Sequence, residues 1–208
     1  MITLALVDDH TMLRKSMAAL LELMGGFRII FQASNGRELL DYLSKNTWPD
    51  LVLMDVSMPV MSGPETTRWL REHCPEVKVV ALSMVRSENT IIRMMSSGAR
   101  AYLLKDVEPE ELVRMLRAVH LHGYAHNEMV PLPGNTQASS GLPIHLSAQE
   151  KQFMQWVCAE KSHKEIAELM QLSPRTIDGY RDSLLRKLGV NSRVGIVMYA
   201  LQNGIVPL

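Results

Sequence analysis

The sequence has little of what several protein classes require. It contains only two cysteines, Cys74 and Cys158, and no CxxC pair or cysteine–histidine spacing, so we expect neither a disulfide framework nor a zinc site. No stretch approaches the roughly 18–20 consecutive apolar residues of a membrane helix. The N-terminus runs into acidic residues instead of a cleavage site. These absences lead us to expect a cytoplasmic protein that does not contact a membrane.

Aromatic residues and net charge are also scarce. Aromatic residues make up 5% of the 208 residues, and 22 basic side chains balance 22 acidic ones. A chain without excess positive charge is not held to nucleic acid by bulk electrostatics, so any DNA binding has to come from a local motif. What is present is an ordinary globular composition, with 47% apolar and 21% charged residues, which predicts a folded chain.

The chain divides at a segment rich in proline, glycine and serine. Residues 125–145 have no sustained apolar period and predict a linker. Before it, in residues 1–124, five short apolar runs alternate with five segments of helical period. This alternation predicts an α/β domain with a doubly wound five-stranded parallel sheet. The predicted strands are 2–7, 27–32, 51–55, 78–83 and 101–105, and the predicted helices lie near 12–24, 36–45, 63–73, 87–97 and 109–121.

Residues 146–208 contain helix start signals and no strand-like run, so they predict an all-α domain. Ser147 with Glu150, and Ser162 with Glu165, have the spacing of capping boxes, in which serine and glutamate each satisfy a free backbone amide. A serine–proline pair at 173–174 predicts a third helix start. With a last helix at roughly 192–203, the domain is expected to have four helices.

Residues 162–189 have the pattern of a helix-turn-helix, with an ordinary helical hairpin as the alternative. Apolar residues at helical spacing mark the expected inner faces, which are Ile166, Leu169 and Met170 in the first helix and Ile177, Leu184 and Leu188 in the second. The last helix carries Val194, Val197 and Leu201 on one face. That face serves either core packing or dimerisation.

Ionisable and hydroxyl side chains stand at the carboxyl ends of the predicted strands. Asp8 and Asp9 end the first strand, Asp55 ends the third, Ser83 the fourth and Lys105 the fifth. Ligands of doubly wound sheets bind at this edge. Three neighbouring carboxylates repel one another unless a divalent cation lies among them, and Mg²⁺ suits such oxygen ligands. Because a lysine and a hydroxyl can bind phosphoryl oxygens, the cluster predicts a phosphoryl-accepting site.

Asp55 is the predicted nucleophile. It stands alone at the end of the middle strand, between the apolar residues Met54 and Val56, whereas Asp8 and Asp9 are adjacent and suit metal binding. In the alternative interpretation the three acids only cap helices. Helix capping does not explain why a serine and a lysine fall at the same edge of the sheet.

Residues 1–123 resemble the receiver domain of a two-component response regulator, which has a flavodoxin-like fold. The resemblance rests on VDDH (7–10), LMDVSMPVMSG (53–63), ALS (81–83) and GARAYLLKD (98–106). It implies that Asp55 accepts phosphate from a sensor histidine kinase. It also implies a set of ligands for Mg²⁺: Asp8, Asp9, Asp55 and the main-chain carbonyl of Ser57.

The same resemblance assigns roles to three further residues. Lys105 would pair with the phosphoryl group, Ser83 would be the switch hydroxyl and Tyr102 the switch aromatic residue. Two positions depart from the family pattern. Met84 is large where a small residue usually follows the hydroxyl, and it could hinder water from reaching the phosphoryl group. Asp106 stands where many receivers have proline, which makes a cis peptide after Lys105 doubtful.

Two enzyme classes with related folds lack their motifs here. A dinucleotide-binding fold requires a glycine-rich turn after the first strand, where this chain has Asp-Asp-His. An aspartyl-phosphate phosphatase resembling the haloacid dehalogenase family requires a second acid two residues beyond its nucleophile, and Ser57 occupies that position. We therefore expect that the chain is not an enzyme.

Residues 146–206 resemble the LuxR-type four-helix DNA-binding domain through LSAQE (146–150), KEIAELMQLSPRTI (164–177) and LLRKLGVNSR (184–193). Together the two resemblances indicate the NarL/FixJ class of response regulators. The positions expected to face DNA are Arg175, Thr176, Asp178, Gly179, Asp182 and Arg186. Many relatives have lysine where Asp178 stands. An aspartate accepts a hydrogen bond from cytosine N4 but repels phosphate, so we expect a few base contacts at modest affinity.

These observations lead us to expect a transcriptional regulator that is switched by phosphorylation and binds specific sequences of double-stranded DNA. Its expected partners are a sensor histidine kinase, DNA and, when phosphorylated, a second copy of the chain. One alternative is a DNA-binding regulator with an inert receiver. Another is a signalling adaptor whose helices bind protein.

Overall fold

A computed structural model describes residues 1–130 and 144–206. The contacts within the chain divide it into two units, Met1–Arg86 with Ser97–His126, and Ser87–Ser96 with Asn127–Leu208. The expected domain boundaries at residues 124 and 146 stay predictions. Most of the expected linker, residues 131–143, lies outside the described residues.

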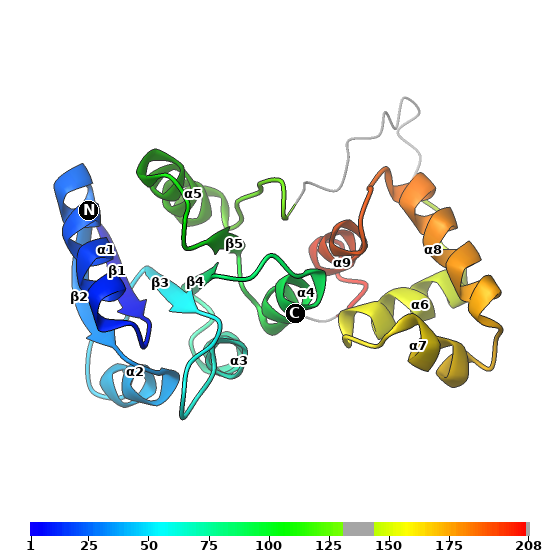
Figure 1. Cartoon of the computed structure of the whole chain (residues 1–208), viewed down its shortest axis with the longest axis horizontal. Helices are drawn as coiled ribbons and strands as arrows, with labels where there is room; N and C mark the ends of the chain where they lie inside the picture. Colours follow the sequence, from blue (N-terminus) through cyan, green and yellow to red (C-terminus); the bar gives the residue numbers. More distant parts are fainter. Residues whose placement is uncertain (131–143, 207–208) are drawn as a thin grey trace. The chain divides into compact units, whose positions relative to one another are not determined.

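The first unit contains a five-stranded sheet with all strand pairs parallel, in the order β2-β1-β3-β4-β5 (Figure 1). Its strands are β1 (Ile2–Val7), β2 (Phe27–Ala33), β3 (Leu51–Asp55), β4 (Lys78–Ser83) and β5 (Ala101–Leu104). The helices between and after them are α1 (Thr11–Met24), α2 (Gly36–Leu43), α3 (Gly63–His73), α4 (Glu88–Ser97) and α5 (Pro109–His122). The predicted doubly wound α/β fold is confirmed.

Helices α1 and α5 pack together, as do α2 and α3, and Figure 1 shows the two pairs on opposite sides of the sheet. Every residue of β3 is buried, since this central strand is covered on both faces. Leu21 of α1 and Leu116 of α5 share one core with Leu4 and Leu6 of β1. This packing fixes the strands whose carboxyl ends carry the acids.

The second unit takes in α4 from the earlier part of the chain, and its C-terminal helices are α6 (Ala148–Cys158), α7 (His163–Met170), α8 (Pro174–Leu188) and α9 (Arg193–Gln202). The predicted all-α domain with four helices is confirmed. Both predicted capping boxes are formed, at Ser147 and at Ser162. Ser173 caps α8, accepting a hydrogen bond from the backbone N–H of Thr176.

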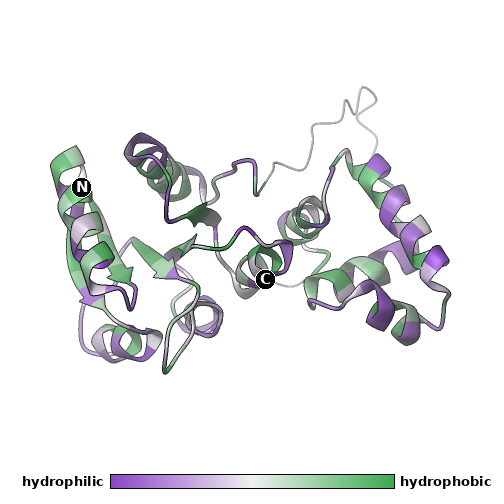
Figure 2. Ribbon diagram, viewed as in Figure 1, coloured by the Kyte–Doolittle hydropathy of each residue, from purple (hydrophilic) through white to green (hydrophobic). Residues whose placement is uncertain are grey.

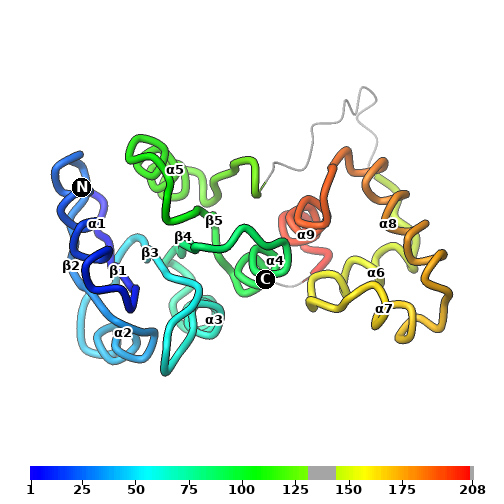
Figure 3. The backbone as a smooth tube through the Cα atoms, in the orientation of Figure 1, coloured from blue at the N-terminus to red at the C-terminus, as the bar shows by residue number. Residues whose placement is uncertain are grey.

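The segment α7-turn-α8 forms the predicted helix-turn-helix, and its tight connection can be followed in Figure 3. Gln171 adopts a left-handed conformation (φ 55°) that ends α7 just before the serine cap of α8. Ile177, Leu184 and Leu188 are buried in α8 as predicted.

The expected inner face of α7 needs correction. Ile166 and Ala167 are its buried residues, whereas the side chain of Leu169 is 47% exposed. Met170 is partly buried, so the packed face of this short helix passes through positions 166, 167 and 170 and leaves Leu169 on its solvent side.

Helix α9 packs against α6 and α8. Val194, Val197 and Leu201 are all buried within this single chain, so core packing accounts for the apolar face of the helix. No helix in residues 1–130 or 144–206 is both long and apolar enough to cross a membrane.

Candidate functional site

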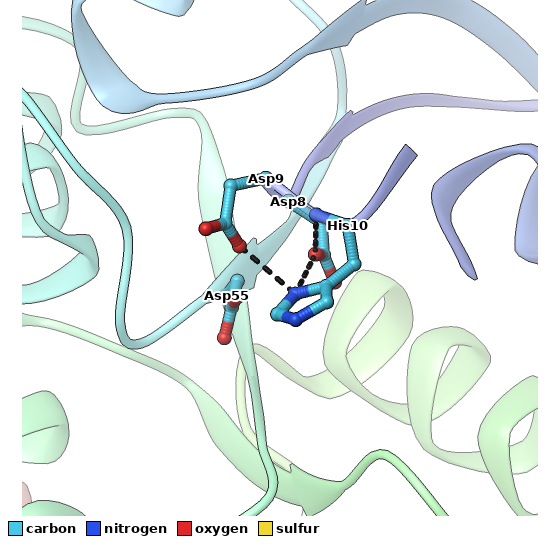
Figure 4. A group of neighbouring side chains, drawn as sticks. All are labelled: Asp8, Asp9, His10 and Asp55. Atoms are coloured by element: carbon cyan, nitrogen blue, oxygen red, sulfur yellow. Dashed lines mark hydrogen bonds and ion pairs between the residues drawn. The ribbon is translucent and has the colours of Figure 1, made fainter. Parts of the chain in front are cut away.

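Four side chains that can bind a metal meet at the carboxyl ends of β1 and β3. Asp8, Asp9, His10 and Asp55 each offer one ligand atom, and these atoms lie within 4.8 Å of one another (Figure 4). Among the described residues this is the one such group of three or more. Asp8 and Asp55 are buried, whereas Asp9 and His10 reach solvent. The cluster therefore combines a buried floor with an open side.

The backbone around Asp55 is held by the start of α3. The N–H of Gly63 donates to the carbonyl oxygen of Val56 over 3.1 Å. A Cβ atom at position 63 would overlap the carbonyl oxygen of Asp55, so only glycine allows this close approach. Ser57 is exposed, and its N–H lies 3.4 Å from Oδ1 of Asp55.

Lys105 joins the two buried acids. Its Nζ lies 2.8 Å from Oδ2 of Asp8 and 2.8 Å from Oδ2 of Asp55, and its side chain is 3% exposed. Burial lowers the pKa of Lys105, but the two carboxylates outweigh burial and hold that pKa above its ordinary value. Burial raises the pKa of Asp55, Lys105 opposes this, and the Asp8 carboxylate adds to it, so the net shift is upward. One ammonium therefore does not fully offset the cost of burying two neighbouring carboxylates.

His10 contributes the remaining contacts inside the cluster. Its Nδ1 lies 2.9 Å from Oδ1 of Asp9 and 3.2 Å from Oδ1 of Asp8, and its backbone N–H donates to the same Asp8 oxygen over 2.7 Å. These contacts are drawn in Figure 4. The carboxylate oxygens are hard ligands of the kind that Mg²⁺ prefers, so the donor set fits a magnesium ion.

Ser83 and Tyr102 are linked through one residue. The Ser83 hydroxyl accepts a hydrogen bond from the N–H of Val85 over 3.0 Å, and the Tyr102 hydroxyl donates to the carbonyl oxygen of Val85 over 2.7 Å. Tyr102 is completely buried. The switch roles of Ser83 and Tyr102 stay predictions.

A cavity of about 320 Å³ opens beside Lys105. The residues that line it are His10, Leu13, Met84, Lys105 and Asp106. The side chain of Met84 is 76% exposed, and Asp106 is also exposed. Both positions at which the sequence departs from the receiver pattern therefore border this cavity.

The six residues expected to face DNA all lie on the exposed side of α8, along which Figure 2 shows mainly hydrophilic residues. A Cβ atom added at Gly179 would meet no atom within 4 Å, so packing does not require glycine there. Asp178 lies 3.4 Å from Nδ1 of His163, and Asp182 lies 3.0 Å from the guanidinium of Arg181. Each of the two acids on this face therefore lies close to a basic side chain, His163 or Arg181.

Comparisons with known proteins match both units. Residues 4–117 match the family model of the "Response regulator receiver domain", and residues 145–200 match that of "Bacterial regulatory proteins, luxR family". This chain is a response regulator. It belongs to the NarL/FixJ class, as the resemblance predicted.

Response regulators similar over the full length support this assignment. The chain is 30% identical to response regulator UvrY of Escherichia coli K12, an alignment that covers 99% of this chain and 96% of UvrY. It is 29% identical to the nitrate/nitrite response regulator protein NarL of the same strain, covering 98% and 96%. The Salmonella typhimurium response regulator RcsB has the same fold, with a TM-score of 0.56, 20% identity and coverage of 95% and 97%.

A second buried charge cluster in this response regulator was not anticipated from the sequence. Glu150 is 3% exposed. Lys187 donates to both its carboxylate oxygens over 2.8 and 2.9 Å, the Ser183 hydroxyl donates over 3.0 Å and the Ser147 N–H over 2.9 Å. Burial raises the pKa of Glu150, but these donors outweigh it and hold that pKa below its ordinary value. From the sequence, the capping-box spacing predicted only the contact of Glu150 with Ser147.

Proposed function

We propose that this response regulator is a transcriptional regulator of a two-component system, and that a sensor histidine kinase transfers a phosphoryl group to Asp55. The observation that carries the proposal is the contact between the Asp55 carboxylate and the buried Lys105 ammonium, at 2.8 Å, at the carboxyl end of the central strand. A buried ammonium next to a carboxylate reduces the repulsion that an incoming phosphoryl group meets. We assign the receiver to residues 1–124, the linker to 125–145 and the DNA-binding domain to 146–208.

In this proposal each residue of the site has one role. The Asp55 carboxylate is the nucleophile, and Lys105 exchanges its contact with Asp55 for one with a phosphoryl oxygen. Asp8, Asp9, Asp55 and the main-chain carbonyl of Ser57 would hold Mg²⁺. When bound, the ion supplies positive charge that neutralises the phosphoryl oxygens. The chain acts as a phosphorylated regulator and not as an enzyme with its own substrate.

Val85 gives the switch a physical route. The Ser83 hydroxyl now accepts a hydrogen bond from the N–H of Val85, so a movement of this hydroxyl toward a phosphoryl oxygen, to which it would donate, also shifts Val85. Val85 also accepts the hydrogen bond of the Tyr102 hydroxyl, so its displacement repacks the buried ring. Two buried side chains thereby couple a local charge to the surface formed by β4 and β5.

DNA binding is assigned to the exposed face of α8, in the major groove. Arg175 and Arg186 provide positive charge, and Thr176 lies at the helix start, where a phosphate contact is expected. Asp178 and Asp182 limit contact with phosphate and favour donor groups on bases. We propose that the phosphorylated form binds as a homodimer to paired half-sites in the cytoplasm.

The decisive experiment separates labelling from DNA binding. A duplex selected from a random library by the phosphorylated full-length protein serves as the probe. We expect phosphorylation to tighten binding of the wild-type chain, Asp55→Asn to abolish labelling, and Ser83→Ala to keep the label but lose the tightening. Arg175→Ala should weaken binding by about 1–3 kcal/mol if this side chain reaches a base.

Two results would favour the alternatives. Equal affinity of the phosphorylated and unmodified chains for the selected duplex would indicate an inert receiver. Failure of the library to yield any bound duplex, even at low salt, would favour an adaptor whose helices bind protein.

A further inference from the structure

The exposed face of α8 carries an acid that a second helix holds in place. Oδ1 of Asp178 lies 3.4 Å from Nδ1 of His163, the first residue of α7. The His163 ring also contacts the fully buried ring of Phe153, with 6.4 Å between the ring centroids. Contact with the core limits the positions that His163 can take, and through His163 those of the Asp178 carboxylate.

Asp182 lies one helical turn further along the same face and is held less firmly. Arg181 donates to its Oδ1 over 3.0 and 3.1 Å, but the two residues are neighbours in the chain and their side chains are 41% and 58% exposed. Exposed ion pairs of this kind are weak, so they restrict side chains little. Asp178 is therefore the better positioned acid of the two for a specific contact.

Gly179 lies next to Asp178 and exposes the backbone of α8 at this point. Glycine inside a helix lowers helix stability relative to alanine. A Cβ atom at position 179 would meet no atom within 4 Å, and the φ of Gly179 is not positive, so neither packing nor backbone conformation requires glycine. A backbone without a side chain allows close approach of another molecule. Because aspartate has a short side chain, close approach brings its carboxylate within reach of a base.

The chemistry of base edges favours cytosine as the partner of this carboxylate. In the major groove the hydrogen-bond donors are the amino groups of cytosine and adenine. Adenine N6 stands beside the acceptor N7, which repels a carboxylate, whereas the major-groove edge of cytosine carries no acceptor. Guanine and thymine present only acceptors there, O6 with N7 and O4.

We propose that Asp178 selects a cytosine by accepting a hydrogen bond from its N4 amino group, and that His163 is the positioning residue for this contact. The inference rests on the proposed function, because it names a base that the exposed face of α8 contacts. Oδ1 stays with His163, and Oδ2 accepts the hydrogen bond from N4. The histidine also reduces the repulsion between the carboxylate and neighbouring phosphates.

The test uses the phosphorylated full-length protein and a duplex that it selects from a random library. Each base pair of the duplex is replaced in turn, and the ratio of the affinities for the original and the substituted duplex is measured. This ratio does not depend on the fraction of folded protein, so it stays valid for a variant that folds poorly. We expect one position at which C·G is preferred about tenfold over T·A, which presents O4 in place of N4.

Substitutions of Asp178 assign that position. Asp178→Ala should abolish the preference for cytosine, and Asp178→Lys should redirect it to guanine, because lysine donates to O6 and N7. Asp182→Ala should affect a different position of the duplex. Glu168→Ala is the matched control, because Glu168 is an exposed acid of α7. It should change the affinity for all duplexes alike and leave the preference within about twofold.

The role of His163 is tested through the same preference. His163→Ala should lower the preference for cytosine about threefold, and His163→Asn, which keeps an N–H donor, should restore most of it. In the Asp178→Ala protein, His163→Ala should have no further effect on base preference, because the histidine acts through Asp178. A loss of affinity that is equal for all duplexes would overturn the positioning role.

The remaining outcomes separate this inference from the proposed function. If the library yields a duplex but Asp178→Ala leaves every base preference unchanged, selection by Asp178 is overturned and the assignment of α8 to DNA stands. A preference that depends on Asp178 but favours a base other than cytosine also overturns the inference. If the library yields no duplex, the proposed function fails and the inference fails with it.

Discussion

Each unit of the chain buries a carboxylate against a lysine, but the two arrangements differ in charge balance. In the receiver one ammonium, that of Lys105, is shared by Asp8 and Asp55 at 2.8 Å each. In the DNA-binding unit a single carboxylate, that of Glu150, is surrounded by the Lys187 ammonium, the Ser183 hydroxyl and a backbone N–H. The receiver cluster is incomplete, because one ammonium serves two carboxylates. The Glu150 cluster is complete, because three different groups donate to one carboxylate.

The pKa directions express this difference. The pKa of Asp55 is raised, mainly by burial and further by Asp8, so folding disfavours its ionised form. The pKa of Glu150 is lowered because its donors outweigh burial, so folding favours its ionised form. An incomplete cluster at a sheet edge is suited to receive a ligand, whereas a complete one between helices holds the fold.

The largest effect should follow from breaking the complete cluster. Lys187→Met leaves the buried Glu150 carboxylate without its positive partner. Because the Lys187 side chain is itself 41% exposed, we expect a loss of about 1–2 kcal/mol in the stability of the DNA-binding unit. Urea unfolding followed by Trp156 fluorescence, with Trp48 and Trp69 replaced by phenylalanine, reports on this unit. Lys151→Met is the control, since Lys151 is exposed on α6. Equal losses in the two variants would contradict a structural role for the pair.

Acid should remove part of the same stabilisation. Because the folded pKa of Glu150 is lowered, its contribution is present above the unfolded value of about 4.3 and is lost as pH falls through the folded pKa. We therefore expect the stability of this unit to fall more steeply below about pH 4.3 in wild type than in Glu150→Gln. Urea midpoints measured between about pH 2 and 6 provide the test. Parallel curves for the two proteins would contradict it.

The strands, the receiver cluster and three helix starts could be predicted from the sequence alone. Apolar runs that end in Asp8, Asp55, Ser83 and Lys105 predicted both the sheet and the cluster, because parallel strands bring their carboxyl ends to one edge. Start signals at Ser147 and Ser162, together with the serine–proline pair at 173–174, likewise predicted three helix starts. Local chemistry and strand order were sufficient for these features.

Contacts between distant elements were not predictable in the same way. Glu150 is 37 residues from Lys187 and 33 from Ser183, and no local pattern connects them. The sequence indicated that Lys105 binds a phosphoryl group. It did not indicate that Lys105 contacts both Asp8 and Asp55 in the unphosphorylated chain. The exposed position of Leu169 was also missed, because the apolar spacing in a short helix does not define which side of that helix packs against its neighbours. Each of these features is decided by tertiary packing.

The smallest expected effect is a gain in stability, whereas the effects above are losses. Asp55→Asn removes one of two carboxylates that share the Lys105 ammonium, and an asparagine oxygen can still accept a hydrogen bond from that ammonium. Since the raised pKa of Asp55 means that its charge destabilises the fold at neutral pH, we expect the receiver to gain about 1 kcal/mol in the absence of divalent cations. Urea unfolding of the Trp156→Phe protein in a chelating buffer reports on this unit through Trp48 and Trp69.

Asp9→Asn is the matched control for this gain, because the side chain of Asp9 is 34% exposed and its charge is therefore better solvated. We expect it to change stability by less than about 0.5 kcal/mol. A receiver stabilised by Asp55→Asn but unable to accept phosphate would show that the incomplete cluster is maintained for its ligand at a cost to the fold. If Asp55→Asn destabilises the receiver as Lys187→Met destabilises the other unit, the two clusters have the same structural role and the contrast between them fails.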